Sequence, residues 1–255
     1  MRILLKPLQI LYVIYAFIWF VALMIPVFIW SLLVLPLGRI RGGNLTYYAC
    51  IVWADIWFAV VFIFHKNIFI EDLKKDQSYI FVANHNSNLD AALIPKTFRH
   101  PIRPLGKVEM VKVRMFGFIY KNAIVTVDRS NAENRIKSVL ILKSVLKKGI
   151  SILVFPEGTF NTTHRPLKEF YDGAFRIAVE TQTPIKPVLV LNAYDRMHYK
   201  SIFSLNPGKS RSVFLPEVSV QGLTVKDVGM LKEKVFGMMK EELVRRGAGW
   251  IEMNK

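Results

Sequence analysis

The sequence predicts an α/β protein, with a largely parallel central sheet, helices on both faces of that sheet, and an N-terminal two-helix membrane motif before it. The opening part of the chain consists of long apolar segments, and residues 7–38 carry no charged side chain. From about residue 67, short apolar runs alternate with amphipathic ones. Strands separated by helices indicate a parallel sheet covered on both sides. We therefore expect a membrane-associated motif at 1–66 and an α/β domain at 67–255.

The first apolar segment is longer than the roughly 20 residues that span a bilayer. Pro36 and Gly38 are expected to end its helix. A second apolar segment, 45–64, contains Asp55, which should face protein or the membrane interface because a carboxylate is costly against lipid. Basic residues flank both segments, so charge alone does not assign their sides. We favour a hairpin that dips into one leaflet over two full spans, at the cytoplasmic face of a membrane (the inner one in a bacterium).

The composition favours a membrane partner and no nucleic-acid partner. Lys+Arg number 35 and Asp+Glu 19, which gives a net charge of +16, while 52% of the 255 residues are hydrophobic. Basic charge combined with uncharged apolar blocks indicates an anionic membrane surface. The single cysteine, Cys50, excludes an intramolecular disulfide framework and a cysteine zinc cluster. No metal site is expected.

Short apolar runs bounded by turn residues mark the strands of the second part. The candidate strands are 80–83, 123–127, 150–155, 185–191 and 212–215. The candidate helices are 89–97, 108–116, 131–148, 172–181 and a last amphipathic one at about 225–246. Ser130 and Glu133 form a capping box for the third of these helices, and Gly149 is its expected stop.

A histidine and an acid follow the first of these strands. His85 lies in the turn after the strand and Asp90 in the first turn of the next helix. The helix dipole keeps such an acid ionised, and an ionised acid can fix the tautomer of a histidine. The pair would then act as a general base toward a hydroxyl. The alternatives are a capping turn with an incidental histidine, or Ser87 as a nucleophile, although Ser87 lacks the G-x-S-x-G elbow.

Three further clusters lie at the ends of other strands. Gly106-Lys107-Val108-Glu109 precedes the strand that ends in Val127-Asp128-Arg129, where the arginine can grip a phosphate or merely pair with Asp128. Phe155-Pro156-Glu157-Gly158-Thr159 places two polar side chains and a glycine at the end of a buried strand. Pro184 and Pro187 bracket the start of a strand and can be purely structural.

Together, these four clusters resemble the conserved blocks of the glycerolipid acyltransferase family, in the order and spacing of its lysophosphatidic acid acyltransferase-like members. The resemblance covers residues 79–192. It implies an enzyme that moves a fatty acyl chain from an acyl thioester, linked to coenzyme A or acyl carrier protein, to the hydroxyl of a lyso-glycerolipid. The acceptor it implies is 1-acylglycerol-3-phosphate and the product phosphatidic acid.

The same resemblance assigns roles to individual residues. It implies His85 and Asp90 as catalytic and Lys107, Arg129, Glu157, Gly158 and Thr159 as substrate-binding. It implies no metal and no bound organic cofactor, since the acyl thioester is a co-substrate. His85 would deprotonate the acceptor hydroxyl, which attacks the thioester directly.

One residue departs from the family pattern. Phe160 stands where phosphate-handling members usually carry arginine, so the acceptor head group is open. The alternatives are a lyso-lipid with another head group, a transacylase that takes its acyl chain from a phospholipid, and a non-catalytic membrane lipid-binding protein.

Overall fold

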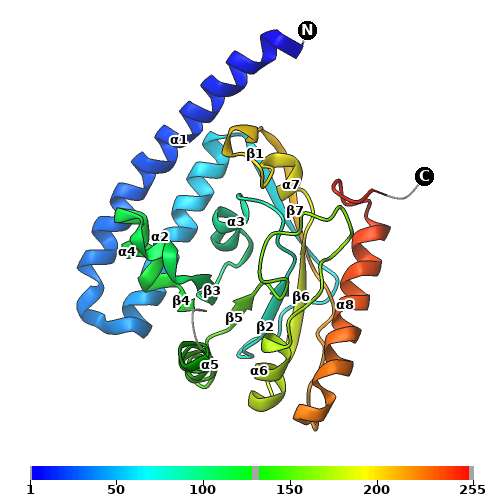
Figure 1. Cartoon of the computed structure of the whole chain (residues 1–255). Coiled ribbons are helices and arrows are strands. Elements are labelled where there is room, and N and C mark those ends of the chain that lie inside the picture. The colour runs from blue at the N-terminus through cyan, green and yellow to red at the C-terminus, as the bar shows by residue number, and fades with distance from the viewer. Residues whose placement is uncertain (1, 128–131, 253–255) are drawn as a thin grey trace.

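A single mixed sheet organises the part of the chain that the computed structural model describes, residues 2–127 and 132–252 (Figure 1). The strand order in this sheet is β1-β7-β6-β2-β5-β3-β4. The strands are β1 Ile63–Phe69, β2 Ile80–Ala83, β3 Arg103–Lys107, β4 Val125–Val127, β5 Ile152–Val154, β6 Ile185–Val190 and β7 Gly208–Phe214. β6 and β7 pair antiparallel, and the other neighbouring strands pair parallel. The prediction of a largely parallel sheet is confirmed.

Helices connect and flank these strands. The α-helices are α1 Arg2–Leu33, α2 Gly38–Val60, α3 Asp90–Thr97, α4 Arg114–Ala123, α5 Ala132–Leu146, α6 Gly173–Thr181, α7 Ala193–Arg196 and α8 Val228–Arg245. The short 3-10 helices are η1 Leu35–Leu37, η2 Val108–Lys112, η3 Ile202–Ser204 and η4 Val225–Asp227.

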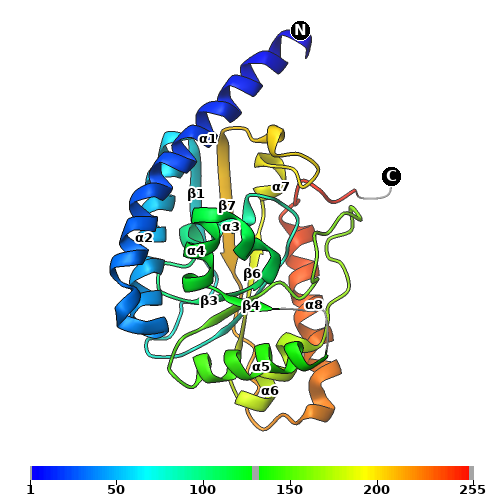
Figure 2. The ribbon, with the colours of Figure 1, turned by 60° about the vertical axis from the view of Figure 1, so that its left-hand side comes forward.

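The two faces of the sheet are covered by different helices. Ile80 and Val82 of β2 belong to a core that includes buried residues of α5, α6 and α8, whereas Phe81 and Ala83 pack in a core with Tyr47 of α2. This alternation follows from the period of two in a strand. Figures 1 and 2 show α6 and α8 on one side of the sheet and α1 and α2 on the other. The predicted arrangement of helices on both faces is confirmed.

The N-terminal segment forms two helices that pack along each other. Tyr12 in α1 donates a hydrogen bond of 2.6 Å to the carbonyl of Val61, just after α2. The 27-residue stretch Pro7–Leu33 reaches a mean hydropathy of 2.5 over an 18-residue window, so it is long and apolar enough to cross a membrane. Within the described residues α2 is not a candidate span by this test of length and hydropathy. It buries aromatic side chains such as Trp57 and Phe58 against the protein. The helix ends before Pro36 and Gly38, as predicted.

Asp55 faces protein, as the sequence predicted. Its carboxylate accepts hydrogen bonds from Lys96 Nζ at 2.7 Å and from Arg99 at 2.6 and 3.0 Å. These two cations lie at the end of α3 and just beyond it. The acid in the second apolar segment therefore joins α2 to the helix that follows the histidine turn.

Some elements differ from the expectation. β1 and β3 were not predicted: β1 follows the apolar segment directly, so its first residues read as helix, and β3 contains Pro104 and Gly106, which are rare inside strands. The helix expected at 108–116 is η2 followed by α4. The expected boundary between residues 66 and 67 falls inside β1, and the Ser130–Glu133 capping box lies outside the described residues and side chains.

Candidate active site

The candidate site lies where β2 and β5 end. The two strands are parallel neighbours, so the residues that follow Ala83 and those that follow Val154 emerge at the same edge of the sheet. The first segment carries His85 and the second the Phe155–Thr159 cluster. The fold thus brings together two clusters that are some seventy residues apart in the chain.

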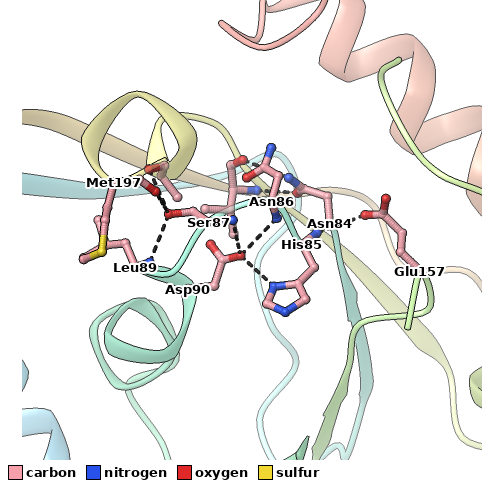
Figure 3. A network of polar contacts seen from close by, with 10 residues as sticks. Asn84, His85, Asn86, Ser87, Leu89, Asp90, Glu157 and Met197 are labelled. Atoms are coloured by element: carbon pink, nitrogen blue, oxygen red, sulfur yellow. Dashed lines mark hydrogen bonds and ion pairs between the residues drawn. The ribbon is translucent and has the colours of Figure 1, made fainter. Parts of the chain in front are cut away.

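Asp90 holds the imidazole of His85 (Figure 3). Asp90 Oδ2 lies 2.7 Å from His85 Nδ1 and accepts hydrogen bonds of 3.1 Å from the backbone N–H groups of Asn86 and Ser87. The carboxylate is 2% exposed, whereas the histidine side chain is 24% exposed. Because a carboxylate only accepts, Nδ1 carries the proton and Nε2 is the basic nitrogen.

The turn that carries the histidine is fastened to β6 and to the loop after it. The buried amide of Asn84 donates to the carbonyl of Val190 at 3.0 Å and accepts from the N–H of Val190 at 2.8 Å. Ser87 Oγ lies within hydrogen-bond distance of the carbonyls of Ala193 and Met197, and it accepts from the N–H of Leu89. This buried hydroxyl is used to fix the turn, so the structure gives the nucleophile alternative for Ser87 no support.

Glu157 is buried beside the site and accepts hydrogen bonds from two backbone N–H groups. Its carboxylate is fully buried, and its two oxygens accept hydrogen bonds of 2.9 Å from the N–H groups of His85 and Lys168. Burial raises the pKa of Glu157 to about 7, although the two backbone hydrogen bonds act to lower it. The acid therefore joins the histidine turn to the loop around residue 168.

Gly158 and Thr159 follow at the surface of this loop. Gly158 has φ +71°, a left-handed conformation that glycine adopts at no steric cost. Thr159 is exposed, and its Oγ1 accepts a hydrogen bond of 2.8 Å from Lys168 Nζ. Lys168 is a candidate source of positive charge beside this cluster, and the folded loop brings its ammonium group to Thr159 from nine residues further along the chain.

Two phenylalanine rings flank the imidazole. The ring of Phe155 stacks on that of His85 with centroids 4.3 Å apart and an angle of 22° between the planes. The ring of Phe160 lies at the same centroid distance, tilted by 54°. The residue that departs from the family pattern therefore contacts the candidate base directly and gives it an apolar wall.

The structure describes one of the two predicted cationic residues, Lys107. Lys107 is exposed at the carboxyl end of β3, opposite Val127 in the register with β4, at the edge of the sheet that carries His85. Arg129 lies outside the described residues. Among those residues no group of three or more His, Cys, Asp or Glu side chains is placed to hold a metal ion.

The fold and the site define an α/β protein with a histidine–carboxylate pair at the carboxyl edge of its sheet. Residues 65–191 match the family model described as Acyltransferase. The mouse 1-acyl-sn-glycerol-3-phosphate acyltransferase alpha is 31% identical over 161 residues, 62% of this chain and 56% of that protein. The Salmonella typhimurium 1-acyl-sn-glycerol-3-phosphate acyltransferase is 28% identical over 180 residues, 67% of this chain and 72% of that protein.

A solved structure supports the same fold. The crystal structure of the 1-acyl-sn-glycerophosphate (LPA) acyltransferase, PlsC, from Thermotoga maritima has a TM-score of 0.75 at 21% identity and covers 99% of this chain and 100% of its own. The chain belongs to the acyltransferase family, through residues 65–191. It spans 56% of the length of the mouse relative.

Proposed function

We propose that the protein is an acyltransferase that moves a fatty acyl chain from an acyl thioester to the hydroxyl of 1-acylglycerol-3-phosphate, giving phosphatidic acid. The observation that carries this proposal is the hydrogen bond between Asp90 and His85 Nδ1, which leaves Nε2 as the base. The proposal also draws on the relatives named 1-acyl-sn-glycerol-3-phosphate acyltransferase. The acyl donor is proposed to be acyl-CoA or acyl carrier protein, as a co-substrate and not a bound cofactor.

The proposed reaction needs one proton acceptor and one electrophile. Nε2 of His85 takes the proton of the acceptor hydroxyl while that oxygen attacks the thioester carbonyl carbon. Asp90 stabilises the imidazolium that forms, as an oriented carboxylate does in other acid–histidine pairs. When the tetrahedral intermediate collapses, the carbon–sulfur bond breaks and the thiolate takes the proton from His85. No covalent acyl-enzyme is required, since a thiolate leaves readily.

We propose cationic contacts for the acceptor phosphate. Lys107 lies at the correct edge of the sheet, and Arg129 follows the strand that pairs with it. An arginine fork is suited to two parallel hydrogen bonds with a phosphate. Phe160, which contacts His85, offers no charge, so these two residues would carry the head-group contact. Gly158 and Thr159 are proposed to line the site, and Glu157 to keep them in place.

We also propose that the protein works on a membrane through α1. This helix exposes a series of large apolar side chains along its length, and a lyso-lipid acceptor resides in a bilayer. The exposed ones include Leu8, Leu11, Phe17, Ile18, Ile29 and Leu33. The proposed partners are therefore membrane lipids, the acyl thioester and the lyso-lipid, with the site at the cytoplasmic face.

A panel of acceptors tests the proposal. Purified full-length protein is given radiolabelled palmitoyl-CoA with lysophosphatidic acid, lysophosphatidylglycerol or lysophosphatidylcholine, and the lipid products are separated. We expect label in phosphatidic acid, and Arg129→Ala should lose most of that product while Lys66→Ala, a substitution of an exposed lysine on β1, should not. Label only in another phospholipid would show that the acceptor is the corresponding lyso-lipid and not lysophosphatidic acid. Label only when a diacyl phospholipid is the donor would indicate a transacylase, and no product with any donor would indicate a lipid-binding protein.

A further inference from the structure

An exposed apolar tip lies in the loop between α7 and β7. Ile202 and Phe203, the first two residues of η3, are 55% and 57% exposed. Lys200 and Lys209 are exposed on either side of this tip along the chain. Two adjacent large apolar side chains held outward between lysines are a costly feature for a surface that meets only water.

The polar side chains of the same loop make hydrogen bonds within the loop and to the end of α7. Ser201 Oγ accepts from the N–H of Phe203, and Ser204 Oγ donates to the carbonyl of Ser201 at 2.6 Å. The Asn206 amide donates to the carbonyls of Asp195, Arg196 and Ser204. These bonds hold the loop in a shape that presents Ile202 and Phe203 and pair several of its polar groups, which lowers the cost of contact with an apolar phase.

The tip continues the apolar surface of α1. η3 packs against α1, and Leu205, the residue after η3, is buried in the same core as Val13 and Ala16 of that helix. Phe62 and Phe64, at the start of β1, are also exposed, and Gly208 at the end of the loop donates its N–H to the carbonyl of Phe62. Figures 1 and 2 both show this loop beside the N-terminal half of α1, at one end of the molecule.

The same loop holds the turn that carries His85. Ser87 forms an antiparallel bridge with His198, and the Asn88 side chain donates to the carbonyls of His198 and Tyr199. The ring of Tyr199 lies near that of Phe160, with 6.4 Å between centroids. Any surface that bound the tip would therefore lie next to the edge of the sheet that carries His85.

We propose that the tip formed by Ile202 and Phe203 is a second membrane contact, which inserts into the interface of an anionic bilayer beside α1 and places the His85 edge against the lipid surface. The inference rests on the proposed membrane association. Lys200 and Lys209 would meet the anionic head groups while the two apolar side chains reach below them.

Insertion is measured by a probe, without reference to catalysis. An environment-sensitive fluorophore is attached to Phe203→Cys in a Cys50→Ala full-length protein, and to Leu140→Cys as the matched control, since Leu140 is 58% exposed on α5. On mixing with vesicles of phosphatidylglycerol and phosphatidylcholine, the probe at 203 should shift to shorter wavelength and be quenched by lipids labelled in the acyl chain. The probe at 140 should do neither. Equal behaviour of the two probes, shifted or not, would overturn the tip contact.

Kinetics tests the consequence for the site. Ile202→Ser with Phe203→Ser should lower turnover of acceptor presented in vesicles about tenfold through the lost apolar contact. It should leave turnover of a monomeric short-chain acceptor within about twofold, because the polar bonds of the loop remain. Leu140→Ser with Ile141→Ser is the control. If the Ile202/Phe203 variant matches this control in turnover on vesicles, the inference is contradicted. If the wild-type protein shows no transfer at all, the proposed function is refuted, and the fluorescence result alone then tests whether the tip inserts.

Discussion

At the scale of single residues, two carboxylates act on one histidine from different directions. Asp90 orients the ring of His85, and Glu157 accepts the backbone N–H of the same residue. The first arrangement was predictable, since an acid early in the next helix stands close to a histidine in the preceding turn. The second arrangement was not predictable, because the direction of the Glu157 side chain depends on the path of a loop, and a loop has no periodic sequence pattern that shows which side chains are buried.

Asp90→Asn should lower turnover by about a hundred- to ten-thousandfold while leaving the fold intact. The amide oxygen can still accept the two backbone N–H groups, but the charge that stabilises the imidazolium is lost. Steady-state kinetics with both substrates varied would show the loss in turnover, with little change in either Michaelis constant. Turnover within threefold of the wild type would mean that Asp90 does not support a base.

Glu157→Gln should cost stability as well as activity. An amide can accept only one of the two backbone hydrogen bonds, and its NH2 group would oppose the other N–H in a fully buried place. Leaving such a group unpaired costs about 1–3 kcal/mol. Denaturant unfolding in detergent measures this, with the exposed Glu169→Gln as control. Equal unfolding midpoints for the two variants would show that Glu157 does not hold the loop.

At the scale of elements, the sequence predicted β2, β4, β5, β6 and part of β7, and it missed β1 and β3. Strands β2 and β5 are continuous apolar runs, as is typical of a buried parallel sheet, and β6 is buried along its whole length although it contains Lys186. β1 is an edge strand whose alternating exposure merges with the apolar segment before it, and β3 carries residues that weaken a strand pattern. Whether such a segment forms a strand depends on its pairing with neighbouring strands, and the local sequence does not determine that pairing.

β1 also contributes a half-buried histidine that should make the protein acid-sensitive. His65 Nδ1 lies 3.0 Å from Ser210 Oγ of β7 and Nε2 lies 3.0 Å from Asn67 Oδ1. Burial, with smaller contributions from Lys96 and Arg99, lowers the pKa of His65 to about 4 from 6.5. The unfolded chain therefore binds the extra proton between these values.

The expected loss follows from that sign. The contribution of neutral His65 is complete above about pH 6.5 and is lost as the pH falls toward 4, by about 3 kcal/mol at 1.36 kcal/mol per pKa unit. Thermal unfolding of the wild type and of His65→Gln across this range measures it. The variant should show the shallower pH dependence, and parallel curves would exclude His65 as the acid-sensitive group.

At the scale of the whole molecule, the N-terminal helices are part of the folded body as well as its apolar surface. α2 contributes Tyr47, Ile51 and Phe58 to buried clusters under the sheet, so removal of both helices would expose the core. Membrane binding is therefore better tested with the intact chain.

Binding to anionic vesicles should survive about 1 M salt, because salt screens the basic surface and leaves the apolar contact of α1. Flotation of full-length protein with vesicles at low and high salt measures this, with a soluble basic protein of similar charge as the control. Release of the full-length protein along with the control would show that charge alone holds it to the membrane.

The base role of His85 is tested most directly by one transfer assay. Wild type and His85→Ala are compared in a single turnover with palmitoyl-CoA and lysophosphatidic acid, after circular dichroism has shown equal folding. The alanine variant should form no phosphatidic acid above the uncatalysed rate, since the proton acceptor beside the acceptor hydroxyl is gone. Transfer by the variant near the wild-type rate would contradict general-base catalysis at this site.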